Sequence, residues 1–328
     1  MRKLRILYAG SPLASAIVLS KLYDYCCSND FCEIVGVLTN PPSVRGRHSD
    51  LIPTEVAQFA EKCNIPVLWF EHLKSEAREK VKQLNADILV CFDFGKIFGP
   101  KFLDLFQLGG INLHPSKLPK YRGCTPVPTA ILNGDSNLGV SVQKLALKTD
   151  EGDILESDEI SLDGTETTQS LMDGDGFESK VTEIGSKLLI SVLSKIKVVD
   201  NEFILPNAKP QNGEVSYTPL IKKEDGIINW NKTAIEINRQ IRAYTPWPLC
   251  FTECNGVKLL ILKAFVSDKK VDEKPGTVLP YQKSIGIEIA CGDGTVLVAT
   301  ELQWQAKKAM DYKSFMNGAR NFIGSVLS

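Results

Sequence analysis

The sequence has few of the residues that build metal sites. Among its 328 residues there are three histidines, and the nine cysteines include no C-x-x-C pair. Structural zinc sites and redox dithiols need two ligands or two thiols at such short spacing. We therefore predict no metal site, and we interpret the cysteines as buried thiols of a reducing compartment.

Long apolar runs and a strong net charge are also missing. No stretch approaches the roughly 18 consecutive apolar residues that a membrane-spanning helix needs. The formal net charge is −1, so an RNA partner would have to be bound by a local basic patch. Residues 1–5 lead into a strand without the features of a signal or transit peptide. We expect a globular, cytoplasmic protein and, because no apolar stripe is left over, a monomer.

The first 205 residues alternate short apolar runs with stretches of helical spacing. This alternation predicts an α/β domain with a doubly wound, Rossmann-like parallel sheet. The turn Gly10-Ser11-Pro12 carries one of the three glycines of a G-x-G-x-x-G motif, so a dinucleotide site is not predicted. The expected strands are 4–9, 34–39, 65–68, 86–92, a strand ending at His114, and 138–147. The expected helices are 14–25, 54–63, 75–84, 126–132 and a helical region over 165–197 that is interrupted at 173–176.

The rest of the chain has a different pattern. Residues 206–219 are rich in Asn, Gln, Gly and Pro and are expected to be a linker. An amphipathic helix within 230–244 is followed by short alternating segments at 249–254, 257–266, 276–279, 285–291 and 295–300. Five or so short strands separated by glycine turns predict a small OB-like β-barrel over residues 220–328.

One stretch combines polar side chains with a stiff loop. Asn112 and His114 end an apolar strand, and because side chains alternate along a strand, both point to the same face. A proline-containing loop follows and closes on Gly123. An isolated histidine is more often structural than catalytic, but the carboxyl end of a strand is where open α/β sheets place their sites. We therefore predict that Asn112 and His114 belong to an active site.

The run from Asn112 to Gly123, N-L-H-P-S-K-L-P-K-Y-R-G, resembles the signature of the folate-dependent formyltransferases. A second segment, Thr149 to Ile154, resembles the D-x-G segment of that family. The resemblance implies a catalytic set of Asn112, His114 and Asp150. An alternative interpretation of Asp150 is a loop cap.

The resemblance also implies a binding site for 10-formyltetrahydrofolate, without a metal. The segment 93–98 stands where the family binds the pteridine ring, although Asp93 and Lys96 depart from its commonest pattern, as Lys148 does near Asp150. The implied folate-binding residues are Phe94, Gly95, Ile97, Ser116, Leu118, Pro119 and Asp150.

A basic loop at 40–48 and two lysines near the C-terminus suggest contact with RNA phosphates, because guanidinium and ammonium groups suit phosphate oxygens. Alternatively, the loop and the lysines are solvent-exposed surface without a binding role. The run I-R-A-Y-T-P-W-P at 241–248 resembles the family members that act on methionyl-tRNA, and the resemblance covers essentially the whole chain. The implied tRNA-binding residues are Arg45, Gly46, Arg47, Lys307 and Lys308.

The implied reaction is transfer of the formyl group of 10-formyltetrahydrofolate to the α-amino group of methionine on initiator methionyl-tRNA. In this family the amine attacks directly and forms a tetrahedral intermediate that the catalytic set stabilises. Two alternatives remain open. The acceptor could be an amino-sugar nucleotide, or the chain could be an inactive module that binds folate or RNA.

Overall fold

The computed structural model describes residues 2–44, 50–174, 176–319 and 321–328. They form two compact units. The first comprises Met1–Pro126, Asn137–Ser161 and Ser170–Thr218, and the second comprises Val127–Ser136, Leu162–Gln169 and Pro219–Ser328. The candidate catalytic residues all belong to the first unit.

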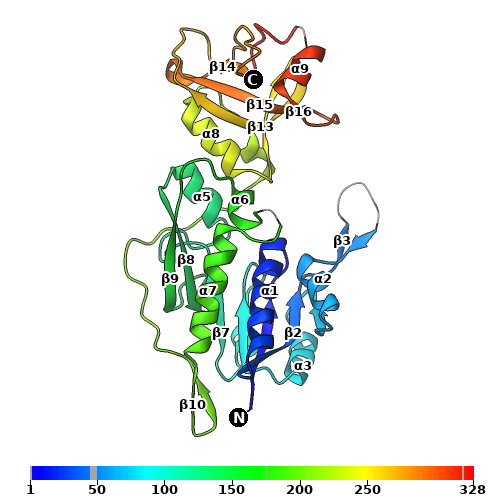
Figure 1. Ribbon diagram of the computed structural model, residues 1–328, viewed down its shortest axis with the longest axis vertical. Coiled ribbons are helices and arrows are strands. Elements are labelled where there is room, and N and C mark those ends of the chain that lie inside the picture. The colour runs from blue at the N-terminus through cyan, green and yellow to red at the C-terminus, as the bar shows by residue number, and fades with distance from the viewer. Residues whose placement is uncertain (1, 45–49, 175, 320) are drawn as a thin grey trace. The chain divides into compact units, whose positions relative to one another are not determined.

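The first unit is built on a seven-stranded sheet with the order β5-β2-β1-β6-β7-β8-β9 (Figure 1). Pairings from β5 to β7 are parallel, whereas β7 to β9 are antiparallel. β6 has all its side chains buried, as expected for a central parallel strand. The strands are β1 (Leu4–Ala9), β2 (Cys32–Thr39), β5 (Val67–Trp69), β6 (Ile88–Cys91), β7 (Gly110–His114), β8 (Asn137–Lys144) and β9 (Ile154–Ser161).

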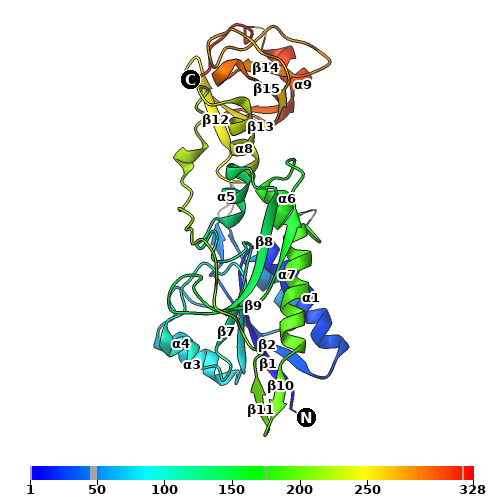
Figure 2. The same cartoon turned by 90° about the vertical axis from the view of Figure 1, so that its left-hand side faces the viewer.

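Helices cover both faces of this sheet. Figure 2 shows α1 (Leu13–Ser28) and α7 (Lys180–Ser194) on one face and α3 (Ser75–Gln83) and α4 (Pro100–Leu103) on the other. The second face is filled by a series of aromatic rings spaced four residues apart, whose centroids lie 5.3–6.0 Å from one another. These rings are Phe94, Phe98, Phe102 and Phe106. The remaining elements of this unit are α2 (Glu55–Lys62) and two short hairpins, β3 (Ser43–Val44) with β4 (Leu51–Ile52) and β10 (Lys197–Val199) with β11 (Glu202–Ile204).

The second unit is organised around an antiparallel sheet with the order β12-β13-β15-β14, in which β16 also pairs with β15. Helix α8 packs against β13 and β15, and Thr233 and Glu236 cap its first turn reciprocally. The strands are β12 (Cys250–Cys254), β13 (Val257–Ser267), β14 (Ile287–Ala290), β15 (Val296–Trp304) and β16 (Met310–Asp311). The helices are α5 (Pro126–Asn133), α8 (Ala234–Ala243) and α9 (Tyr312–Gly318), with short 3-10 turns at Lys223–Gly226 and Gly292–Gly294. Helix α6 (Thr168–Met172) belongs partly to each unit, since the first unit resumes at Ser170.

The structure confirms an α/β first part followed by a β-rich second part, and it differs from the predicted elements in places. Strand β9, the β10–β11 hairpin and helix α9 were not predicted. The interruption expected within the helical region 165–197 is confirmed between α6 and α7, and α7 ends at Ser194 rather than near Lys197. The strand expected at 276–279 is reduced to isolated bridges at Thr277 and Val278.

Candidate active site

The carboxyl end of β7 holds the two polar side chains that the sequence singled out. Asn112 is half-buried and His114 is 5% exposed. On the neighbouring antiparallel strand β8, Gln143 lies opposite Asn112, and Ser141 lies opposite His114. Leu113 points into the core, where it lies against Gly185 of α7. The alternation along β7 therefore separates a packing side chain from two side chains available for chemistry.

Both ring nitrogens of His114 face protein oxygens. Nε2 lies 2.9 Å from the carbonyl oxygen of Tyr121. A carbonyl can only accept a hydrogen bond, so Nε2 carries the proton in the neutral ring. Nδ1 lies 3.7 Å from Oδ1 of Asp150. Nδ1 is thus the nitrogen that can gain or lose a proton, and it does so beside a carboxyl group.

The carboxylate of Asp150 accepts hydrogen bonds from two groups. Its Oδ2 accepts a hydrogen bond of 2.8 Å from the backbone N–H of Gly123, and its Oδ1 accepts one of 2.7 Å from the amide of Gln143. Its backbone is in the left-handed region, with φ 54°. A non-glycine residue is uncommon there and persists only where its surroundings hold it. The carboxylate is therefore placed by the fold rather than by the local preference of its loop.

Residue 152, two positions after Asp150, must be a glycine for steric reasons. A Cβ at this position would lie 1.7 Å from the carbonyl oxygen of Lys144. The close approach lets the N–H of Gly152 donate to Oε1 of Gln143 at 3.2 Å. The glycine thus brings the loop against β8.

The loop after β7 uses its polar groups internally. The hydroxyl of Ser116 donates to the carbonyl of Lys120 at 2.6 Å, and the hydroxyl of Ser141 donates to the carbonyl of Ser116 at 2.7 Å. Leu118 is 6% exposed, and Pro119 is also buried. These three expected folate-binding residues therefore lie together beside His114, where they shape the loop.

Of the other expected folate-binding residues, Asp150 lies in the loop after β8, and three follow β6, the strand next to β7. The ring of Phe94 is buried against Phe98, while its carbonyl oxygen accepts a hydrogen bond of 2.9 Å from the Asn40 side chain. Gly95 has φ 77°, and Ile97 is 77% exposed. The groups that this turn can offer to a ligand are therefore its backbone and the Ile97 side chain, not the Phe94 ring.

Cys91, at the end of β6, is not suited to nucleophilic catalysis. Burial raises the pKa of its thiol, and the nearby carboxyl of Asp93 raises it further. The thiol is therefore held in its protonated, weakly nucleophilic form. The candidate catalytic residues remain Asn112, His114 and Asp150.

Residues 209–218, which were expected to belong to a linker, bind along the first unit; we call them the strap. The amide of Gln211 donates to the carbonyl oxygens of Asp150 and Gly152, both at 2.8 Å. Its oxygen accepts from the guanidinium of Arg122 at 2.7 and 3.1 Å. The hydroxyl of Tyr217 donates to Glu151 at 2.8 Å. The strap thus joins the loop after β7 to the Asp150 loop.

Sequence reasoning missed Gln143, Gln211 and Tyr217. A signal for Gln143 was present, because Ser141 and Gln143 alternate with apolar residues in a buried strand, as Asn112 and His114 do. Gln211 and Tyr217 lie in a stretch that has no periodic pattern, and only the tertiary fold brings them to the site.

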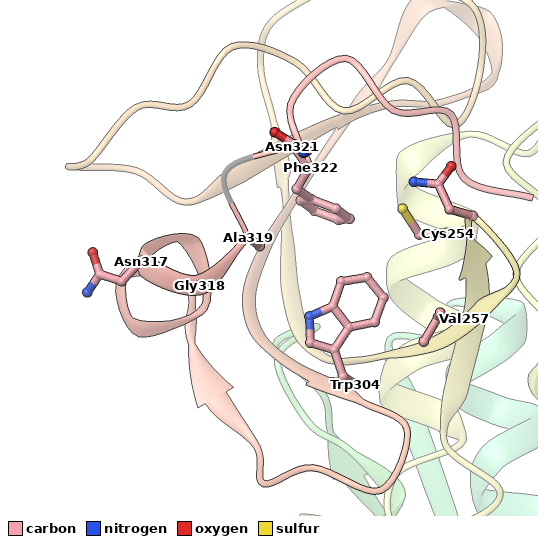
Figure 3. A pocket seen from close by; sticks show the side chains of 9 residues that line it. Cys254, Val257, Trp304, Asn317, Gly318, Ala319, Asn321 and Phe322 are labelled. Carbon is pink, nitrogen blue, oxygen red and sulfur yellow. The ribbon is translucent and has the colours of Figure 1, made fainter.

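Two of the five expected tRNA-binding residues are among the described residues. Lys307 and Lys308 belong to the second unit, are exposed, and follow β15 in a turn where the N–H of Lys307 donates to the carbonyl of Trp304 at 3.0 Å. Arg45, Gly46 and Arg47 lie outside the described residues. A cavity of about 470 Å³ in the second unit is lined by Trp304, Phe322 and Cys254 and includes neither lysine (Figure 3).

Within the described residues, no group of three or more His, Cys, Asp and Glu side chains is arranged to hold a metal ion. No helix in this part of the chain is long and apolar enough to cross a membrane.

Known structures share this fold. HypX from Aquifex aeolicus in complex with tetrahydrofolic acid aligns with 98% of this chain and 48% of its own, at a TM-score of 0.62 and 14% identity. This chain thus spans about half the length of HypX. WlaRD, a sugar 3N-formyl transferase crystallised with dTDP and 5-N-formyl-THF, aligns with 94% of this chain and all of its own, at a TM-score of 0.60 and 19% identity. At such identities the likeness concerns the fold.

Sequence comparison adds closer relatives. Residues 5–193 match the family described as formyl transferase, and residues 220–320 match the formyl transferase C-terminal domain. The methionyl-tRNA formyltransferase of Treponema denticola is 41% identical over 98% of both chains. Those of Treponema pallidum and Borrelia hermsii are 37% and 36% identical over 96% and 99% of this chain. These matches show that the chain belongs to the formyltransferase family.

Proposed function

We propose that this protein transfers the formyl group of 10-formyltetrahydrofolate to the α-amino group of methionine on initiator methionyl-tRNA. The observation that carries the proposal is the buried His114 beside Asn112 at the end of β7, with its Nδ1 3.7 Å from Oδ1 of the half-buried Asp150. This combination supplies a donor for an oxyanion and a group that moves a proton.

In the proposed reaction, the amine nitrogen attacks the formyl carbon and forms a C–N bond, while the carbonyl oxygen becomes an oxyanion. Asn112 donates its side-chain N–H to that oxygen, and the protonated Nδ1 of His114 stabilises the same charge. The amine then loses a proton, the bond from the formyl carbon to the folate nitrogen breaks, and that nitrogen is protonated as tetrahydrofolate leaves. No covalent intermediate with the enzyme is needed.

His114 and Asp150 have distinct roles in this scheme. The carbonyl of Tyr121 keeps the proton on Nε2, so proton movement takes place at Nδ1. Asp150 stabilises the doubly protonated ring by its charge. The 3.7 Å separation exceeds a direct hydrogen bond, so a bridging water or a small closing shift completes the proton path.

The acceptor is inferred from the relatives and the second domain. Relatives named methionyl-tRNA formyltransferase match nearly the whole chain, including residues 220–328. The amino-sugar alternative is less favoured, because the sugar formyltransferase WlaRD is only 19% identical. We assign phosphate contacts to Arg45, Arg47, Lys307 and Lys308, and folate contacts to the residues that follow β6 and β7. A substrate used in translation initiation fits the expected location in the cytoplasm.

The test is formyl transfer from 10-formyltetrahydrofolate to charged initiator methionyl-tRNA, with an amino-sugar nucleotide as a parallel acceptor. The proposal predicts N-formylmethionyl-tRNA and no formylated sugar. Transfer to the sugar alone would keep the catalytic set and overturn the acceptor. Transfer to neither, with folate or RNA still bound, would favour the inactive binding module.

A further inference from the structure

Gln143 is the first of two glutamines that surround Asp150. It is 1% exposed, and its amide orientation is determined by its neighbours. Its Oε1 accepts from the N–H of Gly152 at 3.2 Å, so its Nε2 must point to Oδ1 of Asp150, to which it donates at 2.7 Å. This is the same carboxylate oxygen that faces Nδ1 of His114. Gln143 therefore fixes the position of Oδ1, the Asp150 oxygen that faces His114.

Gln211, whose amide nitrogen lies 3.5 Å from Oε1 of Gln143, holds the backbone of Asp150. Arg122 has only donors, so the Gln211 oxygen faces the guanidinium and the Gln211 nitrogen faces the carbonyls of Asp150 and Gly152. The loop that contains Arg122 also contains Tyr121, whose carbonyl holds Nε2 of His114. Gln211 thus links the loop whose Tyr121 carbonyl faces His114 to the loop that contains Asp150.

Asp150 needs both restraints because of its backbone. A left-handed φ of 54° is costly for aspartate and relaxes when its surroundings loosen. Relaxation of this backbone would move the Asp150 carboxylate away from His114. The contact between the two side chains, whether direct or through a water, would then be lost.

We propose that Gln143 and Gln211 are positioning residues that act through Asp150, setting its carboxylate against Nδ1 of His114 for proton transfer. The inference rests on the proposed formyl transfer. Neither glutamine is assigned to bind a substrate, so their loss affects turnover rather than affinity for tRNA.

The kinetic test uses Gln143→Met and Gln211→Leu, which keep similar bulk and remove the hydrogen bonds. We expect kcat to fall roughly ten- to hundredfold, with KM for tRNA within about twofold of the parent value. The matched control is Gln58→Leu, which removes a glutamine bond of 2.9 Å to the carbonyl of Pro53 at the start of α2. It should leave kcat unchanged. A rise in KM for tRNA with an unchanged kcat would overturn the proposal.

A double-mutant cycle separates positioning from general weakening of the fold. In an Asp150→Asn background, adding Gln143→Met or Gln211→Leu should cost less than about twofold, because the shared target is already lost. If each glutamine variant lowered kcat by the same factor in both backgrounds, it would act independently of Asp150, and the inference would be wrong.

A spectroscopic test does not depend on any acceptor. The three histidines can be labelled with ¹⁵N, and the ring shifts of His114 report its tautomer. We expect the Nε2–H form in the parent protein, altered Nδ1 shifts in both glutamine variants, and parent-like shifts in Gln58→Leu. Unchanged His114 shifts in both variants would refute positioning. If the parent protein transferred no formyl group, this result alone would decide the inference, separately from the proposed function.

Discussion

The protonation of the His114 ring depends on the residues that surround it in the fold. The sequence indicated its importance through its place beside Asn112 at the end of an apolar strand. It did not indicate which ring nitrogen would exchange protons. That depends on the carbonyl of Tyr121, seven residues further along the chain, and on Asp150 from another loop. The chemical role of the residue is thus decided by contacts that spacing alone does not determine.

The first prediction concerns the catalytic pair itself. Asn112→Ala and His114→Ala should each lower kcat/KM by on the order of a hundredfold or more, equivalent to about 3 kcal/mol of lost transition-state stabilisation. The rate of formyl transfer measures this, and the melting temperature checks the fold. His72→Ala is the control, since His72 is exposed. Near-parental turnover of either variant would remove the basis of the proposed mechanism.

The second prediction concerns Gly152. In Gly152→Ala the new Cβ would collide with the carbonyl of Lys144, so the Asp150 loop must move or the fold must weaken. We expect about 1–3 kcal/mol of lost stability, seen as a lower melting temperature, together with a fall in kcat. Gly99→Ala is the matched control, because a Cβ there meets nothing within 4 Å and its φ is −75°. Equal behaviour of the two variants would contradict this account.

At the scale of elements, the predicted segments are those whose burial gives a regular pattern. β1 was predicted with its observed bounds, and β6 as a continuous apolar run. β9 was missed because it lies at the edge of the sheet, where most of its side chains are partly or fully exposed. The β10–β11 hairpin did carry a signal. Asp200 and Asn201, both with positive φ, form the kind of two-residue turn that such residues favour.

Among the elements, the strap matters most for the site. Its attachment through Tyr217 and Glu151 can be tested by measuring the stability of the fold as a function of pH. The pKa of Glu151 is lowered mainly by the hydrogen bond from the Tyr217 hydroxyl, and further by Lys148 and Arg122. A lowered pKa in the folded state stabilises the fold above the ordinary value of 4.5, and this stability is lost as the pH falls through the folded-state value.

Tyr217→Phe should therefore lower the melting temperature at pH 7, and the difference from the parent should shrink toward pH 3. Calorimetry at both pH values measures it. Tyr281→Phe, in the second unit, is the control and should show no pH-dependent difference. A deficit for Tyr217→Phe that is the same at both pH values would show that the Glu151 contact is not its cause.

At the scale of the whole molecule, the chain joins an α/β unit to a β-rich unit, and relatives named methionyl-tRNA formyltransferase match it along nearly its full length. A net charge of −1 offers no general attraction for RNA, so the binding of a tRNA must rely on local cations.

The corresponding prediction is a salt effect on one substrate only. KM for the tRNA should rise steeply with salt, while KM for folate stays nearly constant, because each phosphate contact releases counterions. Replacing both Lys307 and Lys308 by alanine should reduce the slope of log KM against log salt by roughly two. Lys101→Ala, at an exposed position on α4, is the control. An unchanged slope in the double variant would exclude these lysines from the RNA contact.

The sequence by itself determined the fold class, the pairing of Asn112 with His114 on one strand face, and the family resemblance, because each depends on local periodicity or on short motifs. Only the tertiary structure decided how Asp150 reaches His114, why Gly152 is needed, and how residues 209–218 support the site. The physical reason is that these depend on contacts between residues distant in the chain, such as Gln211 with Asp150, and on a strained backbone that only packed surroundings can hold.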